Sequence, residues 1–145
     1  IINISSIGGV MGLPYQGYYS ASKFAIEGYS EALAAEVRGM GIKVVIVEPG
    51  DFATNFTSNR KNSDLTLKNI DYSRSFNRSL KIIEKEENGG LKPIVLAKKI
   101  EKIIEKKNPR FRYVVANMEQ RLSVLLKKIV PANMFIDILR NYYKV

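Results

Sequence analysis

The chain has 145 residues, of which 46% are hydrophobic and 26% are charged, as is usual for a globular domain with one core. It contains no cysteine and no histidine, which excludes disulfides, thiolate nucleophiles, histidine bases and the usual zinc sites. Its chemistry must therefore use Ser, Tyr, Lys, Asp, Glu, Asn or a bound cofactor. No apolar run approaches the ~20 residues that a membrane-spanning helix needs.

The net charge of +9 is unevenly distributed along the chain. Residues 1–58 contain three basic and five acidic residues, whereas residues 59–145 contain twenty basic and nine acidic residues. The second part is therefore strongly basic. This charge indicates either a solvated lysine-rich surface or contact with an anionic partner such as a phosphate, a lipid surface or nucleic acid.

The first elements predicted are a short strand over residues 1–6 and a long helix over residues 16–38. The strand is rich in isoleucine and ends at Ser5 and Ser6, followed by the Gly8–Gly9 pair. The helix has an apolar face at helical spacing, and Gly39 and Gly41 are suited to its C-terminal end. The residues of the face expected to be buried are Ala21, Phe24, Ala25, Gly28, Tyr29, Leu33 and Val37.

A second strand is predicted over residues 44–47, ending at Pro49 and Gly50. Its uninterrupted β-branched run is typical of a strand buried on both faces of a parallel sheet. A strand, a long helix and a second strand make a βαβ unit with a right-handed crossover.

Residues 51–71 are polar and poorly periodic, which is typical of a lid or binding loop beside a strand end. A helix is predicted over residues 72–87, and a further helix begins at Pro93 and ends before Asn108–Pro109. The last strand is expected at residues 113–116.

The tail, residues 119–143, predicts two short amphipathic helices separated at Pro131. The apolar stripes expected on them are Leu122, Leu125, Leu126 and Ile129 in the first, and Phe135, Ile138, Leu139 and Tyr142 in the second. The favoured interpretation is that these stripes close a substrate pocket or pack on the domain. Contact with an anionic membrane surface, an oligomer interface and nucleic-acid binding are the alternatives.

Tyr19 and Lys23 lie four residues apart on the long helix and share a face. An ammonium beside a phenol lowers the tyrosine pKa, which makes Tyr19 a usable general acid or base. Ser6 ends the preceding strand, where ligands of α/β sheets bind, and could hydrogen-bond a substrate oxygen. About one Tyr-x-x-x-Lys pair is expected by chance in such a chain, so the alternatives are a surface Tyr–Lys pair, and Ser6 as a turn cap.

Three blocks of sequence follow one another along the first part of the chain. They are Asn3-Ile4-Ser5-Ser6-Ile7-Gly8-Gly9, then Tyr19-Ser20-Ala21-Ser22-Lys23-Phe24-Ala25, and then Val47-Glu48-Pro49-Gly50-Asp51-Phe52-Ala53-Thr54. Together they resemble the short-chain dehydrogenase/reductase family. Their order and spacing match the family, and the resemblance is close over residues 1–58. Residues 90–145 resemble more loosely the C-terminal ends of members that act on lipophilic alcohols.

The resemblance implies roles for individual residues. Tyr19 is expected to be the general acid in carbonyl reduction and the base in alcohol oxidation, assisted by Lys23, which also binds the nicotinamide ribose. Ser6 is expected to hold the substrate oxygen, with Ser5 as the less favoured candidate. The residues expected to bind the cofactor, NADP or NAD with NADP slightly preferred, are Tyr19, Lys23, Pro49, Gly50, Phe52 and Thr54. No metal is expected.

The resemblance also implies an α/β fold, the C-terminal part of a doubly wound parallel sheet of Rossmann type. Residues 1–145 are expected to form a single partial domain: a catalytic βαβ segment (1–58), a substrate loop and helix region (59–92) and a C-terminal helix, strand and amphipathic tail (93–145). The family's glycine-rich turn and catalytic asparagine are expected upstream of Ile1, so the chain alone should be inactive.

The expected activity is hydride transfer between a nicotinamide cofactor and a carbonyl or alcohol, with a small, lipophilic substrate. We expect a cytoplasmic homodimer or homotetramer that does not bind nucleic acid, with peripheral membrane contact as an alternative. The competing class is a non-enzymatic, cofactor-dependent binding or membrane-associated module that reuses the fold.

Overall fold

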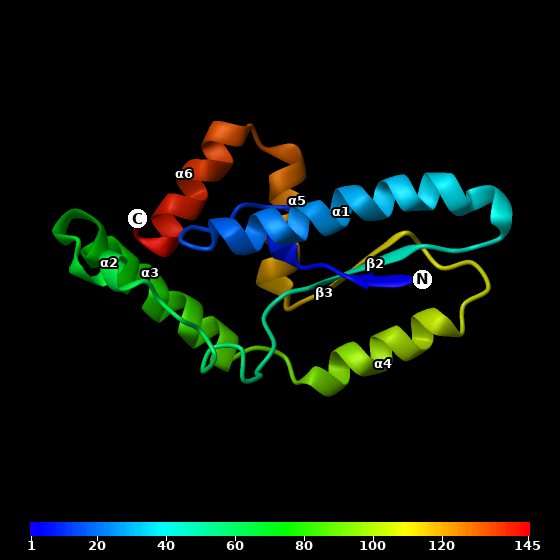
Figure 1. The fold of residues 1–145 in the computed structure, drawn as a ribbon, viewed down its shortest axis with the longest axis horizontal. Helices are drawn as coiled ribbons and strands as arrows, with labels where there is room; N and C mark the ends of the chain where they lie inside the picture. The colour runs from blue at the N-terminus through cyan, green and yellow to red at the C-terminus, as the bar shows by residue number, and fades with distance from the viewer.

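The computed structural model describes all residues, 1–145, and contains a three-stranded parallel sheet in the order β1-β2-β3 (Figure 1). The strands are β1 (Ile2–Ile4), β2 (Val45–Pro49) and β3 (Arg112–Val115). Ile46, in the middle of β2, is opposite Asn3 on one side and Arg112 on the other. The predicted α/β class, parallel pairing and central buried strand are confirmed.

The helices follow the predicted order, with one addition. They are α1 (Gly17–Val37), α2 (Asp64–Lys68), α3 (Ile70–Asn88), α4 (Pro93–Ile104), α5 (Met118–Ile129) and α6 (Ala132–Tyr143), with short 3₁₀ turns η1 (Ile7–Gly9) and η2 (Arg38–Met40). Residues 51–71 were predicted to be irregular throughout, which is wrong at α2. The next helix begins earlier than predicted because the Asn69 side chain accepts a hydrogen bond from the Tyr72 N–H at 3.1 Å and caps it.

The core consists of two clusters of buried apolar side chains. In one cluster Val45 and Val47 pack with Tyr113 and Val115 of β3 and with Ile103 of α4. A second cluster joins the η1 region to the tail helices through Ile7, Met11, Val124 and Phe135. These contacts hold the carboxyl ends of the strands next to η1, α5 and α6.

The face of α1 that was predicted to be buried is exposed, which corrects the sequence analysis. Phe24 and Tyr29 are exposed to solvent, whereas Ser20, Glu27 and Ser30 are buried. The polar side of the helix faces the sheet because its side chains have partners there. The Asn3 amide donates to the Ser30 hydroxyl at 2.8 Å, and Arg112 donates to Glu27 at 3.1 Å.

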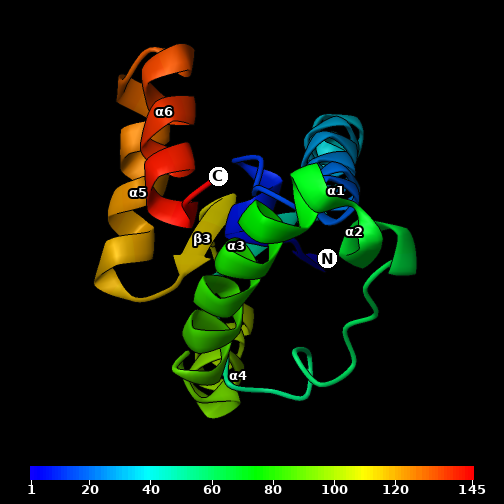
Figure 2. The same ribbon diagram turned by 90° about the vertical axis from the view of Figure 1, so that its left-hand side faces the viewer.

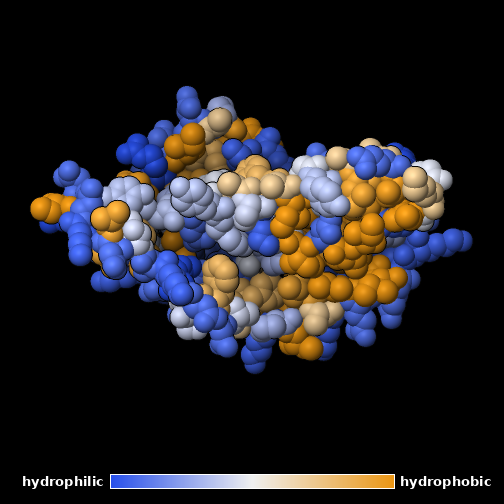
Figure 3. All heavy atoms as spheres, in the orientation of Figure 1, coloured by the Kyte–Doolittle hydropathy of each residue, from blue (hydrophilic) through white to orange (hydrophobic).

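Apolar side chains gather around the N-terminus and along the neighbouring part of α1 (Figure 3). Ile1, Ile4 and Ile42 are among the exposed apolar side chains of the chain. β1 pairs only with β2, so its other edge is free. None of the helices combines the length and the apolar character that crossing a membrane requires.

α5 and α6 lie side by side on one flank of the molecule, with α1 on the other flank (Figure 2). Pro131 separates them as predicted, and the buried anchors are Val124 and Phe135. Leu122 and Leu126 of the α5 stripe line a large cavity beside the strand ends, as the favoured interpretation predicted. Leu125 and Ile129 are more than half exposed, so for these two residues the predicted packing is wrong.

Candidate active site

The site begins where β1 and β2 end, at the carboxyl edge of the sheet. η1 follows β1 directly and packs against the N-terminal half of α1 through two glycines. A Cβ on Gly8 would lie 3.0 Å from the Tyr19 ring, and one on Gly9 would lie 3.0 Å from the Lys23 carbonyl oxygen. The small size of these residues therefore allows α1 to approach η1 and brings Tyr19 and Lys23 next to Ser6.

Ser6 caps η1, as one of the sequence alternatives proposed. Its hydroxyl oxygen accepts a hydrogen bond from the Gly8 N–H at 3.0 Å and donates a long one to the Pro49 carbonyl at 3.4 Å. A serine hydroxyl has one donor and two acceptor positions. Capping uses only an acceptor position, so the Ser6 proton can be redirected from the weak Pro49 contact to a ligand oxygen.

The pKa of Tyr19 is raised above the ordinary value for a phenol, mainly because the side chain is partly buried. The nearby Ser6 hydroxyl lowers this pKa, whereas the negative charges of Asp51 and Glu87 raise it. The sequence predicted the opposite direction from the Tyr19–Lys23 spacing. That prediction is wrong for this arrangement, so the Tyr19 phenol is protonated at neutral pH.

Lys23 lies close to Tyr19, with its Nζ 5.9 Å from the centre of the tyrosine ring. The ammonium donates a hydrogen bond to the Ile4 carbonyl oxygen at 3.2 Å. Lys23 is thus held at the end of β1 and brings a positive charge to the same edge of the site as Ser6 and Tyr19.

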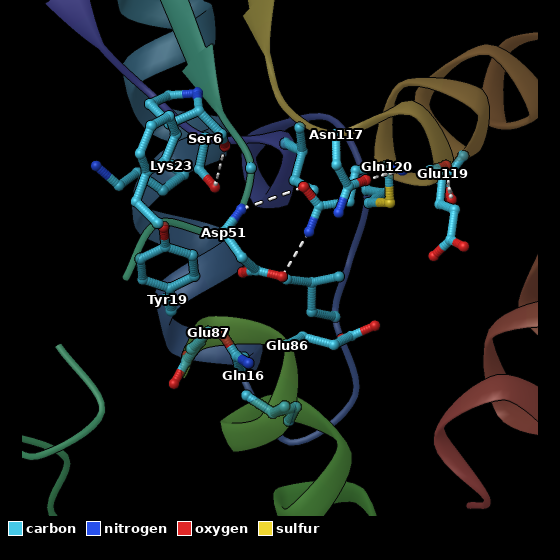
Figure 4. A pocket seen from close by; sticks show the side chains of 18 of the residues that line it. Ser6, Gln16, Tyr19, Lys23, Asp51, Glu86, Glu87, Asn117, Glu119 and Gln120 are labelled. Carbon is cyan, nitrogen blue, oxygen red and sulfur yellow. Dashed lines mark hydrogen bonds between the residues drawn. The ribbon is translucent and has the colours of Figure 1, made fainter. Parts of the chain in front are cut away.

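A cavity of about 740 Å³ opens beside these residues, and 16 of its 31 lining residues are hydrophobic. All the residues that sequence reasoning selected lie on its wall: Ser6, Tyr19, Lys23, Pro49, Gly50, Phe52 and Thr54. In the view of Figure 4 the Ser6–Tyr19–Lys23 group lies on one side, and Asn117, Glu119 and Gln120 lie on the other. The segment between β3 and α6 therefore closes the cavity opposite the Tyr19 group.

Acidic residues that the sequence analysis did not select also reach this cavity. Gln120 binds Asp51 twice: its Nε2 donates to Oδ2 at 2.5 Å, and its Oε1 accepts from the Asp51 N–H at 3.3 Å (Figure 4). Burial and the charges of Glu86 and Glu87 raise the pKa of Asp51 to about 6. The position of Asp51 directly after Pro49–Gly50 was the available signal, but its neighbours come from α3 and α5.

The residues present fit one end of a nicotinamide cofactor. Lys23 offers a cationic donor and Tyr19 a phenol, next to an apolar strand end at Pro49 and Phe52. A planar, weakly polar ring with an attached ribose requires this mixture of apolar wall and few donors.

Several known proteins are similar in sequence to this chain. A family model described as short chain dehydrogenase matches residues 1–65. A 3-ketodihydrosphingosine reductase of Bacteroides thetaiotaomicron is 59% identical over 145 residues, covering 100% of this chain and 54% of the relative. An NADPH-dependent 3-dehydrocapnine reductase of Ornithobacterium rhinotracheale is 37% identical over 116 residues, covering 80% of this chain and 41% of the relative.

The fold agrees as well. The crystal structure of a short-chain dehydrogenase from Streptomyces avermitilis superposes with a TM-score of 0.68 at 28% identity, covering 99% of this chain and 49% of that chain. The chain thus spans about half the length of the relatives it matches. Parallel sheet, family match and relatives lead to one conclusion: the chain belongs to the short-chain dehydrogenase/reductase family, whose members are oxidoreductases that use a nicotinamide cofactor.

Proposed function

We propose that the protein containing this chain is an NAD(P)-dependent reductase that converts a lipophilic ketone to an alcohol. The observation that supports this most directly is the shared cavity: Ser6, Tyr19 and Lys23 lie on one wall of a largely apolar space. The apolar wall suits a hydrocarbon chain, and the three polar groups suit a single carbonyl.

In the proposed reaction, Ser6 donates its hydroxyl proton in a hydrogen bond to the ketone oxygen and fixes its position. Tyr19 gives its phenolic proton to the same oxygen as negative charge develops there. Lys23, held at the end of β1 by the Ile4 carbonyl oxygen, would bind the nicotinamide ribose. When bound, the nicotinamide supplies the hydride.

The raised pKa of Tyr19 is consistent with its proposed role as the general acid of the reduction. A tyrosine that acts as a general acid must carry its proton at the working pH, and burial keeps this phenol protonated. Oxidation of an alcohol would need the phenolate, which the nearby Asp51 and Glu87 disfavour.

The relatives suggest a substrate for this chain. One is named for reduction of 3-ketodihydrosphingosine and another for 3-dehydrocapnine, the latter with NADPH. We propose a long-chain ketone of the ketodihydrosphingosine type as substrate and NADPH as the preferred cofactor. The cavity of about 740 Å³ is in the range of small-molecule sites, and its open side allows a longer chain to extend outward.

The test follows NADPH and NADH oxidation by the full-length protein with a panel of long-chain ketones. Tyr19→Phe is compared with Tyr18→Phe, which makes the same change at a side chain that is 98% exposed. We expect Tyr19→Phe to lower kcat by about 10²–10⁴-fold while cofactor still binds, and Tyr18→Phe to match the wild type. Full activity in Tyr19→Phe would refute the mechanism, and cofactor binding without turnover of any ketone would favour the binding-module alternative.

We also propose that the exposed apolar face of α1 is a subunit interface of a homodimer or homotetramer. Phe24 and Tyr29 are 45% and 63% exposed on this face, although aromatic side chains normally pack. Light scattering on the full-length protein and on Phe24→Glu tests this. We expect the variant to dissociate; the same mass for both proteins, or a monomeric wild type, would contradict the proposal.

A further inference from the structure

α5 presents a stripe of apolar side chains to solvent. The stripe consists of Met118, Leu122, Leu125 and Ile129, which are 79%, 54%, 53% and 67% exposed. Their spacing of four, three and four residues places them on one side of the helix. Val124, on the other side, is buried and anchors the helix to the domain.

A basic groove adjoins this stripe. It is a cavity of about 420 Å³ formed by α4, the β3 region and α5, and Leu125 is part of its wall. The cations that line the groove are Lys99, Lys106, Arg110, Arg112, Arg121 and Lys128. Arg112 is paired with three carboxylates, but the other five have no carboxylate within 4.0 Å.

The opposite side of the stripe borders the active-site cavity. Leu122 and Leu126 of α5 line that cavity, together with Ile138 and Tyr142 of α6. Leu122, Ile138 and Tyr142 are also partly exposed to solvent. The stripe therefore lies between the basic groove on one side and the apolar wall of the proposed substrate site on the other.

We infer that this surface docks on an anionic lipid bilayer, with the α5 stripe in the interface and the basic groove on the lipid phosphates. An anionic bilayer offers both apolar depth and negative charge, which is the combination this surface presents. Nucleic acid would neutralise the cations but leave the apolar stripe in water. A second copy of the chain would bring its own unpaired cations to the contact. The surface lies at the β3 side of the sheet, away from the free edge of β1.

The inference deepens the proposed function and rests on it for the substrate. A lipophilic ketone dissolved in the bilayer would reach the cavity along Leu122 and the exposed side of α6 without crossing water. Docking itself depends only on the stripe and the groove, so it can be tested separately from catalysis.

The test is flotation of the full-length protein with vesicles of phosphatidylcholine alone or mixed in equal parts with phosphatidylglycerol, at low and high salt. Arg121→Glu/Lys128→Glu removes groove cations, and Leu125→Asp/Ile129→Asp removes the stripe without touching the active-site cavity. Arg78→Glu/Lys81→Glu, at exposed positions of α3, is the matched charge control. Circular dichroism confirms that each variant is folded, and turnover of a short, water-soluble ketone reports the catalytic site independently.

We expect binding to the mixed vesicles only, weakened by salt, about 30-fold weaker in the groove variant and lost in the stripe variant. The α3 control should bind like the wild type. Equal binding to both kinds of vesicle, no flotation of the wild type, or unchanged binding of the groove variant would overturn the inference. If the soluble ketone is turned over normally by both variants, a negative flotation result counts against docking alone and leaves the proposed reaction intact.

Discussion

Arg112 on β3 is the cation on which two buried carboxylates depend. It lies 3.1 Å from Glu27 Oε2, 3.3 Å from Glu48 Oε1 and 2.5 Å from Glu31 Oε1. The side chains of Glu27 and Glu48 are only 8% and 2% exposed, and neither has another cation within 4.0 Å. Arg112→Met would keep much of the side-chain volume but leave two carboxylates buried without a partner.

Removing one partner of a buried ion pair costs roughly 3–5 kcal/mol. Arg112 is 36% exposed, so water screens part of its interaction, and we expect a loss of about 2–3 kcal/mol. Urea unfolding of the full-length protein at pH 7 measures this loss. The control is Arg140→Met, which breaks an exposed pair of 3.9 Å with Asp137 and should cost under about 0.5 kcal/mol.

The pH dependence gives a second readout of the same change. Burial and the neighbouring Glu27 raise the pKa of Glu48, whereas Arg112 lowers it. When a carboxyl has a raised pKa in the folded state, the folded protein loses stability as the pH rises and the carboxyl ionises. The stability lost in Arg112→Met should therefore be smaller at pH 5 than at pH 7, because part of the buried carboxylate charge is then neutralised by protonation. Adding Glu48→Gln should restore part of the lost stability at pH 7. A defect no larger than that of Arg140→Met, or no recovery with Glu48→Gln, would refute this account.

Gly9→Ala places a Cβ 2.5 Å from the Ser5 Oγ and 3.0 Å from the Lys23 carbonyl oxygen. We expect the free energy of unfolding, measured in urea, to fall by about 1–3 kcal/mol. Gly12→Ala is the control and should leave it unchanged, because a Cβ there meets no atom within 4 Å. Because the pKa of Asp51 is raised from 3.8 to about 6, its ionisation destabilises the fold increasingly between about pH 4 and pH 6. Asp51→Asn should therefore need more urea to unfold than wild type at pH 8, and this advantage should shrink as the pH falls toward 4. Because Asp51 also raises the pKa of Tyr19, the same variant should lose reductase activity at a lower alkaline pH.

Local sequence patterns were sufficient to predict most of the fold. The unbroken run before Pro49 predicted a central parallel strand, and β2 is that strand. Gly41 adopts a φ of +74°, a left-handed conformation that favours glycine, and so ends the segment after α1 as expected. In these cases the determining physical cause lies within a few residues of the element.

The buried face of α1 could not be predicted from helical periodicity alone. Its apolar side is exposed, and its polar side is buried because Glu27 finds Arg112 on β3, 85 residues away, and Ser30 finds Asn3. A polar residue can be buried only when a partner satisfies it, and the sequence does not show which distant partner will be present. The same reason explains why the Asp51–Gln120 contact, across 69 residues, was missed.

The Tyr19 pKa shows how spatial neighbours can outweigh sequence neighbours in a site. The four-residue spacing correctly places Lys23 near the Tyr19 ring, but the ammonium is hydrogen-bonded to the Ile4 carbonyl. The opposing effects come from burial and from Asp51 and Glu87, which reach the site from a loop and from α3. Their sum keeps the proton on the phenol. The positions of Tyr19 and Lys23 follow from the helix, whereas the state in which Tyr19 waits for a substrate follows from the cavity that the rest of the chain builds around it.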